Sequence, residues 1–188
     1  MSTLEVDAIK DKTGTTTLVT LSSSGITYPQ GHVIKTSSVF DDNSGTQVVI
    51  SADATWTEIS SGLRLTHQAD HANNILLMSF STAFVSPNAS NLYKCKFYNQ
   101  GGGADITLPS AGGSRGRPHW AKRVNPVDTN DQEMINMQMK HVAGSTSSIT
   151  YSIYFYTQSS DVQFFSSTLS DANGFQAGGT FIIYEVQA

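Results

Sequence analysis

Short β-prone segments separated by turn residues run along most of the chain, and this pattern constrains its fold more than any other feature. The pattern is clearest in the run Leu92, Tyr93, Lys94, Cys95, Lys96, Phe97 and Tyr98. A period of two is typical of a strand with one buried face. We therefore predict that Tyr93, Cys95 and Phe97 face the core and that the lysines and Tyr98 face outward.

Other segments carry a similar signal, and clusters of Gly, Pro, Asn and Ser separate them. The most apolar run, Ile75–Val85, is predicted to be the central core strand, because its Ser, Thr and Phe residues favour a strand over a helix. Glu133–Val142 fits a helix or a strand, and its alternating apolar positions favour the strand. The remaining predicted strands are Val33–Phe40, Gln47–Ser51, Asp53–Ile59, 63–66, Ser148–Thr157, Val162–Phe165 and Thr180–Val186.

Composition supports an all-β fold. The 188 residues include 25 Ser and 20 Thr, which suit turns and exposed strand faces rather than helices. Strands do not alternate with helical segments, so a parallel sheet is not expected. We predict an antiparallel β-sandwich, jelly-roll-like, as a head formed by residues 31–188.

The N-terminal stretch, residues 1–30, is predicted to form a separate short β stalk or arm. It contains two short strands around the turn Asp11–Gly14 and too few apolar side chains for a core of its own. An ordered piece of this size needs a partner, and the same stretch of neighbouring copies is the simplest one. The residues predicted to serve in oligomerisation or anchoring are Leu4, Val6, Ala8, Ile9, Val19, Leu21 and Ile26.

Charge and cysteine content exclude several classes of protein. The net charge of −4 argues against general nucleic-acid binding, which needs a basic surface. The single cysteine, Cys95, cannot form an intrachain disulfide. Residues 1–12 are polar and do not resemble a signal peptide, and no apolar run approaches the roughly 20 residues of a membrane-spanning helix. We expect no membrane insertion.

Candidate catalytic and metal-binding residues are sparse. His67 and His71 have the spacing of a helical zinc site, but the surrounding residues are typical of a strand end and a turn, so an ordinary polar loop is favoured. Cys95 is predicted to be buried and unreactive. No nucleophile elbow, phosphate-binding loop or calcium loop is present in the sequence. We predict no catalytic residues, no metal, no cofactor and no enzymatic activity.

The one concentrated basic segment is RGRPHWAKR, residues 115–123, inside a long irregular stretch from Asn99 to Asp131. Arg and Trp are enriched in binding hot spots, and an aromatic ring with arginines also suits a sugar. Contact with a partner or subunit, contact with a glycan, and a solvated loop are the open alternatives. The candidate contact residues are Arg115, Arg117, His119, Trp120, Lys122 and Arg123.

Three phrases of the chain resemble short tail-fibre-like structural proteins in the virions of tailed phages, particularly marine and cyanobacterial ones. They are MSTLEVDAIKDKTGTTTLVTLSSSGIT at the start, ATWTEISSGLRLTHQADHANNILLMSFS in the middle and GTFIIYEVQA at the end. The resemblance covers most of the chain. Those heads often carry Lys before the central strand, where this chain has Asn73 and Asn74.

The resemblance implies a non-enzymatic virion component, a homotrimer that is made in the host cytoplasm and associates with other virion proteins. The first hypothesis is a tail-fibre-like protein whose head contacts a host-surface glycan or protein. The second is a capsid decoration or cement protein that stabilises the shell. The third is a polysaccharide-degrading head, for which Glu58, Glu133, Glu185 and the Asp residues are the available carboxylates.

Overall fold

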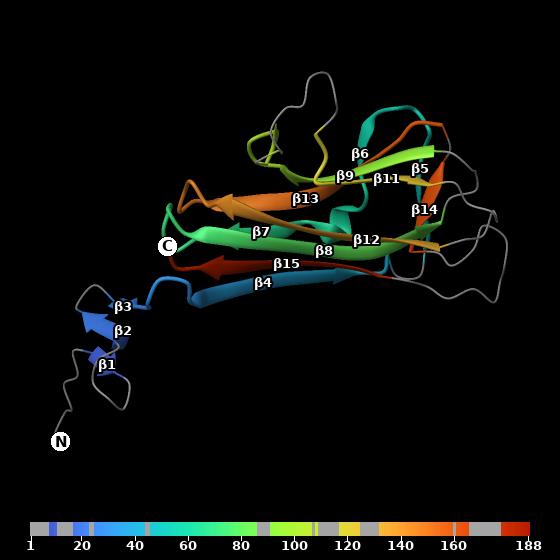
Figure 1. Cartoon of the computed structure of the whole chain (residues 1–188). Coiled ribbons are helices and arrows are strands. Elements are labelled where there is room, and N and C mark those ends of the chain that lie inside the picture. The colour runs from blue at the N-terminus through green and yellow to red at the C-terminus, as the bar shows by residue number, and fades with distance from the viewer. Residues whose placement is uncertain are drawn as a thin grey trace.

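A computed structural model describes residues 8–10, 17–22, 25–43, 46–85, 91–106, 108, 117–124, 132–159, 161–165 and 178–188. The first described residues form a small antiparallel sheet of β1 (Ala8–Lys10), β2 (Thr17–Ser22) and β3 (Gly25–Thr27). Two strands were predicted here, and the third forms because residues 25–27 continue as a hairpin on β2. Figure 1 shows this sheet beyond one end of the main body.

The chain enters the main body through a turn at residues 28–32. Gly31 has a positive φ of 88°, which glycine adopts without steric cost. Its N–H donates to the carbonyl of Gln187 at 2.9 Å, and the N–H of Gln187 donates to the carbonyl of His32 at 2.8 Å. The junction with the N-terminal sheet is therefore fastened to the last residues of the chain.

One layer of the main body is a six-stranded antiparallel sheet. Its long strands lie in the order β4 (Val33–Asp41), β15 (Gly179–Val186), β8 (Ile75–Val85) and β12 (Gln132–Val142). Two short strands, β14 (Val162–Phe164) and β5 (Val48–Ile50), continue the sheet beside the far end of β8. The predicted central strand Ile75–Val85 is confirmed, and it pairs with β12 along its whole length.

The second layer is also antiparallel, with β9 (Asn91–Asn99) and β13 (Ser148–Thr157) at its centre. The outer edge of β9 pairs with β10 (Ala104–Asp105) and with β11 (Trp120–Val124). The outer edge of β13 pairs with β7 (Leu65–Gln68) and β6 (Trp56–Glu58). A single 3₁₀ turn, η2 (Ser61–Leu63), lies between β6 and β7.

The predicted antiparallel β-sandwich is confirmed, and Figure 1 shows the two sheets as stacked layers. If β6 and β7 count as one strand position and the short strands β5, β10 and β14 are left aside, eight positions remain. Numbered in chain order, they form one sheet in the order 1-8-3-6 and another in the order 2-7-4-5. Consecutive positions thus often lie in opposite layers. The head is held together by contacts between segments that are far apart in the sequence.

Aromatic side chains fill the space between the layers. Phe84 is fully buried at the centre, with ring centroids at 5.1 Å from Tyr93, 5.3 Å from Phe155 and 5.8 Å from Phe164. Such tilted and edge-on pairs add about 0.5–1.5 kcal/mol each beyond the burial of their area. The predicted inward set of β9 is confirmed, because Tyr93, Cys95 and Phe97 are fully buried.

The irregular stretch predicted from Asn99 to Asp131 contains two strands. β10 and β11 both form there, paired with the edge of β9. The surrounding glycines and prolines favour a loop, so local propensity does not predict these strands. They form because their backbones pair with the available edge of β9, which outweighs local propensity. In the described part of the chain, no helix is long and apolar enough to cross a membrane.

Candidate functional site

The structure does not gather the predicted basic segment into one surface. Arg117 and Arg123 are exposed, and Arg115 lies outside the described residues. His119 turns inward, with its Nδ1 accepting a hydrogen bond from the N–H of Phe97 at 3.0 Å. The ring of Trp120 packs edge-on against Phe84, at 6.1 Å between centroids.

Lys122 has a different role from its neighbours. It pairs with the carboxylate of Glu133 on β12. Because β11 and β12 belong to different sheets, this ion pair spans the open side of the sandwich. The hypothesis that residues 115–123 contact a partner stays a prediction, but the part of the segment best placed for it is Arg117 and Arg123.

The residues predicted for oligomerisation lie on the N-terminal sheet or just before it. Ile9 on β1 is 49% exposed, and Val19 on β2 is partly buried. Leu4 and Val6 lie outside the described residues, whereas the backbones of Ala8, Leu21 and Ile26 lie in β1, β2 and β3. The boundary at residue 30 and the role of this sheet in assembly stay predictions.

The outward side of the second sheet carries a group of aromatic and charged side chains that we term the aromatic face. Strand register brings them together, because Tyr156 pairs with both Trp56 and Lys94, and Tyr154 pairs with both Glu58 and Lys96. The members of the face are Trp56, Glu58, Lys94, Lys96, Tyr98, Tyr154 and Tyr156. All are partly exposed except Lys96, which is 7% exposed.

Ring and cation contacts hold this face in one arrangement. The rings of Tyr98 and Tyr154 lie 4.5 Å apart, and those of Trp56 and Tyr156 lie 5.6 Å apart. The Nζ of Lys96 lies 4.4 Å from the Trp56 ring and also pairs with Asp105 on β10. Cation–π contacts of this kind contribute from about 0.5 kcal/mol when exposed to about 2 kcal/mol when desolvated.

A row of hydrogen-bonded polar side chains lies along one side of the aromatic face. The guanidinium of Arg64 donates from Nε and Nη2 to the two carboxylate oxygens of Glu58, at 2.8 Å and 2.7 Å. The amide Nε2 of Gln100 donates to Glu58 at 3.1 Å and to the hydroxyl of Ser152 at 2.9 Å. Glu58 therefore has fixed partners, and hydrogen bonding with it raises the pKa of Arg64.

The outward side of the first sheet, which we term the aliphatic face, differs. It is formed by Ile75, Leu77, Ser79, Asn136, Gln138, Lys140, Val142, Ile182 and Tyr184. Leu77 is 41% exposed, Tyr184 37% and Val142 52%. A groove of about 410 Å³ runs between Leu77, Tyr184 and Lys140. Among these described positions Lys140 carries the one charge.

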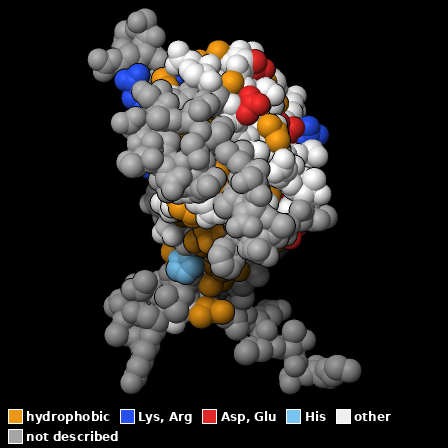
Figure 2. All heavy atoms as spheres, turned by 90° about the vertical axis from the view of Figure 1, so that its right-hand side faces the viewer, with side chains coloured by type: hydrophobic (Ala, Val, Ile, Leu, Met, Phe, Trp, Pro, Cys, Tyr) orange, Lys and Arg blue, Asp and Glu red, His pale blue; other side chains and the backbone are white. Residues whose placement is uncertain are grey.

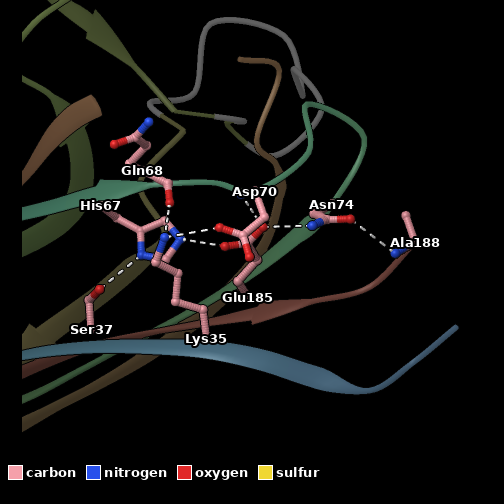
Figure 3. A network of polar contacts seen from close by, with 8 residues as sticks. All are labelled: Lys35, Ser37, His67, Gln68, Asp70, Asn74, Glu185 and Ala188. Atoms are coloured by element: carbon pink, nitrogen blue, oxygen red, sulfur yellow. Dashed lines mark hydrogen bonds and ion pairs between the residues drawn. The ribbon is translucent and has the colours of Figure 1, made fainter. Parts of the chain in front are cut away.

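A buried polar network (Figure 3) lies near the C-terminus, at the end of the sandwich next to the N-terminal sheet (Figure 1). Glu185 of β15 is fully buried, and its carboxylate contacts His67 Nε2 at 3.1 Å, the backbone N–H of Asp70 at 2.7 Å and the amide of Asn74 at 2.6 Å. His67 was predicted to lie at a polar strand end, but it is a buried residue of β7 whose Nδ1 bonds the hydroxyl of Ser37 at 2.9 Å.

This network fastens several segments to one another. Lys35 of β4 donates to the carbonyl of Gln68 at 2.6 Å and pairs with Asp70 at 3.1 Å. The backbone N–H of Ala188 donates to the side chain of Asn74 at 3.3 Å. Because these contacts join β4, β7, the following turn and the C-terminus, the network stabilises the end of the head that receives the N-terminal sheet.

The three glutamates considered for glycoside cleavage lie in different settings. Glu58 is on the aromatic face, Glu133 is at the open side of the sandwich and Glu185 is in the buried network. Cys95 is fully buried, and its burial raises the pKa of its thiol.

No protein-family model matches the chain, and no curated protein matches it. Among solved structures, it is similar to chains of infectious bursal disease virus, with 11% identity and a TM-score of 0.39 for the Gx strain and 12% and 0.42 for the Gt strain. These alignments cover 89% of this chain but only 40% and 42% of the viral chains.

A third similar structure is described as Bacillus endospore appendages that form disulfide-linked pili. The identity is 12% and the TM-score 0.29, with 86% of this chain and 99% of that chain covered. The chain thus spans less than half of the viral chains that it matches. Likenesses at these identities and TM-scores establish neither a function nor a partner.

Proposed function

We propose that this chain is a non-enzymatic structural protein of a phage virion, a homotrimeric tail-fibre-like protein whose head contacts the host surface. The observation that carries the proposal is the two-part build. A small N-terminal sheet shares no strand pairing with the head in the described part of the chain, and it lies beyond one end of the sandwich. That arrangement suits an anchor or stalk followed by a head.

The aliphatic face supports self-association of the head. Its exposed Leu77, Tyr184 and Val142 present apolar area, and copies of a face with so little charge can meet without like-charge repulsion. A second copy of the chain is therefore the proposed occupant of its groove. The resemblance of three sequence phrases to tail-fibre-like virion proteins supports the same assignment.

Figure 2 views the end of the head away from the N-terminal sheet, where the described side chains include apolar groups and few charged ones. In the assembly proposed here, other virion proteins bind residues 1–30 and the head points away from the particle.

Immunogold electron microscopy of intact particles tests this function. We expect label on the tail at tens of copies per particle, and a mass of the purified chain near three times 20.2 kDa. A monomer at micromolar concentration, or particles without label, would overturn the proposal.

A capsid decoration protein is the second candidate, because an N-terminal sheet placed beyond the head can also serve as an arm along a shell. Label over the capsid at hundreds of copies would favour it over the fibre.

A further inference from the structure

The aromatic face carries rings that are not part of the core of the sandwich. The core is filled by the inward rings of β9 and β13, whereas Tyr98, Tyr154 and Tyr156 point to the opposite side and stay partly exposed. Trp56 lies beside them, from a short strand of three residues. Partly exposed aromatic rings next to charged side chains are typical of a binding surface.

The charges on this face are unbalanced. Arg64 pairs with Glu58, and Lys96 pairs with Asp105, so these four groups offset one another. Lys94, whose Nζ lies 4.4 Å from the Tyr156 ring, has no ion-pair partner in the described part of the chain. The same holds for Arg123 on β11, which faces the same side because its neighbour Lys122 points toward Glu133. Among the described residues the face thus has an excess of positive charge, on a chain whose net charge is −4.

We infer that the aromatic face binds an anionic polysaccharide, an inference that rests on the proposed host-contact function for its biological target. The rings of Trp56 and Tyr156 offer flat apolar area for the apolar side of sugar rings. Lys94 and Arg123 can pair with carboxylate or sulfate groups of the ligand, whereas Arg64 and Lys96 are already paired with carboxylates of the protein.

The row of polar side chains beside the rings supplies hydrogen bonds of fixed direction. Gln100 is fixed by its bonds to Glu58 and to the buried Ser152, so the carboxylate of Glu58 and the amide of Gln100 are held in place before a ligand arrives. Groups that are fixed in advance lose less conformational entropy on binding. Sugar hydroxyls, which both donate and accept, match this pair of a carboxylate and an amide.

Single-stranded nucleic acid also binds aromatic rings and cations, but the charge favours the glycan. Nucleic-acid binding uses a basic groove that follows many phosphates. On this face Lys94 and Arg123 are the cations without a carboxylate partner among the described residues, and the whole chain is acidic. An acidic polysaccharide can be held through one or two of its charged sugars, with the other contacts made by the rings and the hydrogen-bonding groups.

Affinity gel electrophoresis of the full chain tests the inference. The probes are polygalacturonate, alginate, hyaluronate and chondroitin sulfate, with neutral dextran and oligo-thymidylate for comparison. We expect retardation by at least one acidic polysaccharide, weakened by added salt and absent with dextran. Retardation by none of the four, or stronger binding of the oligonucleotide, would overturn the inference.

Variants locate the binding. Tyr156→Ala and Lys94→Gln should each weaken it by about tenfold, whereas Val49→Ala and Lys35→Gln, which change exposed side chains outside both faces, should leave it unchanged. Thermal unfolding by circular dichroism checks that all four variants fold. Equal losses in the two pairs would contradict the assignment to this face.

The assay is independent of the particle. A chain that binds acidic polysaccharide but is missing from virions would overturn the proposed function and leave this inference standing. A chain found on the tail that binds none of the four polysaccharides would do the reverse.

Discussion

Across the second sheet, one row of outward side chains reads Ala121, Lys94, Tyr156 and Trp56, whereas a matching row across the first sheet reads Lys140, Leu77, Tyr184 and Thr36. Both rows stand on antiparallel strands with the same alternation. The aromatic face has cations placed over rings, and the aliphatic face has apolar side chains around a groove. We therefore propose different partners for the two faces, a second copy of the chain for the aliphatic face and a charged ligand for the aromatic face.

The largest expected effect concerns the buried polar network, which stabilises the sandwich that carries both faces. Replacing Glu185 with Ala leaves His67 and Asn74 without their buried carboxylate partner, and removing one member of a buried pair costs about 3–5 kcal/mol. We expect the free energy of unfolding, measured with urea, to fall by this amount.

Glu58→Ala is the matched control, because it removes a carboxylate from the partly exposed aromatic face. Its effect should be smaller than that of Glu185→Ala. Equal losses would show that the buried network is not the main fastening of this end of the head.

The next effect separates the faces by their role in assembly. Leu77→Glu places a charge in the groove of the aliphatic face, where each copy in the assembly would have to desolvate it. We expect association to weaken by about tenfold or more, equivalent to about 1.4 kcal/mol, in sedimentation equilibrium.

Thr150→Glu serves as its counterpart, since it adds the same charge to the outward side of β13 on the second sheet. This variant should associate like the parent chain. Assembly that survives Leu77→Glu, or that fails equally in both variants, would remove the proposed distinction between the faces.

A smaller effect measures how firmly the aromatic face is organised. Lys96 is nearly buried between Trp56 and Asp105, so its contact with the Trp56 ring should be partly desolvated. A double-mutant cycle with Trp56→Leu and Lys96→Met should give a coupling energy of about 0.5–2 kcal/mol. A coupling energy of zero would mean that the ring and the cation are only neighbours.

The smallest expected effect is a pH dependence of stability that arises from a histidine between the two sheets. Burial lowers the pKa of His141 below its ordinary 6.5, and the nearby His119 lowers it further. A depressed pKa in the folded state means that the stabilising contribution is complete above pH 6.5 and is lost as the pH falls below that value. Stability should decrease from pH 7 to pH 5 in urea titrations, with a shallower slope in His141→Gln. His71→Gln, a change at an exposed histidine, is the control and should keep the slope of the parent chain. An unchanged slope in His141→Gln would show that other groups cause the pH dependence.

Local alternation in the sequence was enough to predict several strands. The two sides of Leu92–Tyr98 were assigned correctly, because Cys95 is buried and Lys94 is outside. The strand bounds Ile75–Val85 and Ser148–Thr157 were predicted in full. These segments are long, and their packing partners reinforce the local preference.

The sites could not be predicted in this way, because they depend on long-range register. Glu185 meets His67 across 118 residues of sequence, and Trp56 reaches Tyr156 through the pairing of β6 with β13. The basic segment at residues 115–123 was conspicuous in sequence, yet strand β11 turns Trp120 into the core. A period of two says which residues share a side of one strand, but not which strands become neighbours.

Hydroxyl-radical footprinting of the assembled full chain, read by mass spectrometry, tests the difference between the two faces most directly. We predict strong labelling of Trp56 and Tyr156 and weak labelling of Leu77 and Tyr184 in the assembled chain. Tyr184 should become more strongly labelled in the dissociated Leu77→Glu variant. Addition of a bound acidic polysaccharide should then protect Trp56 and Tyr156. Protection of the aromatic face in the bare assembly, with Tyr184 freely labelled, would contradict the account.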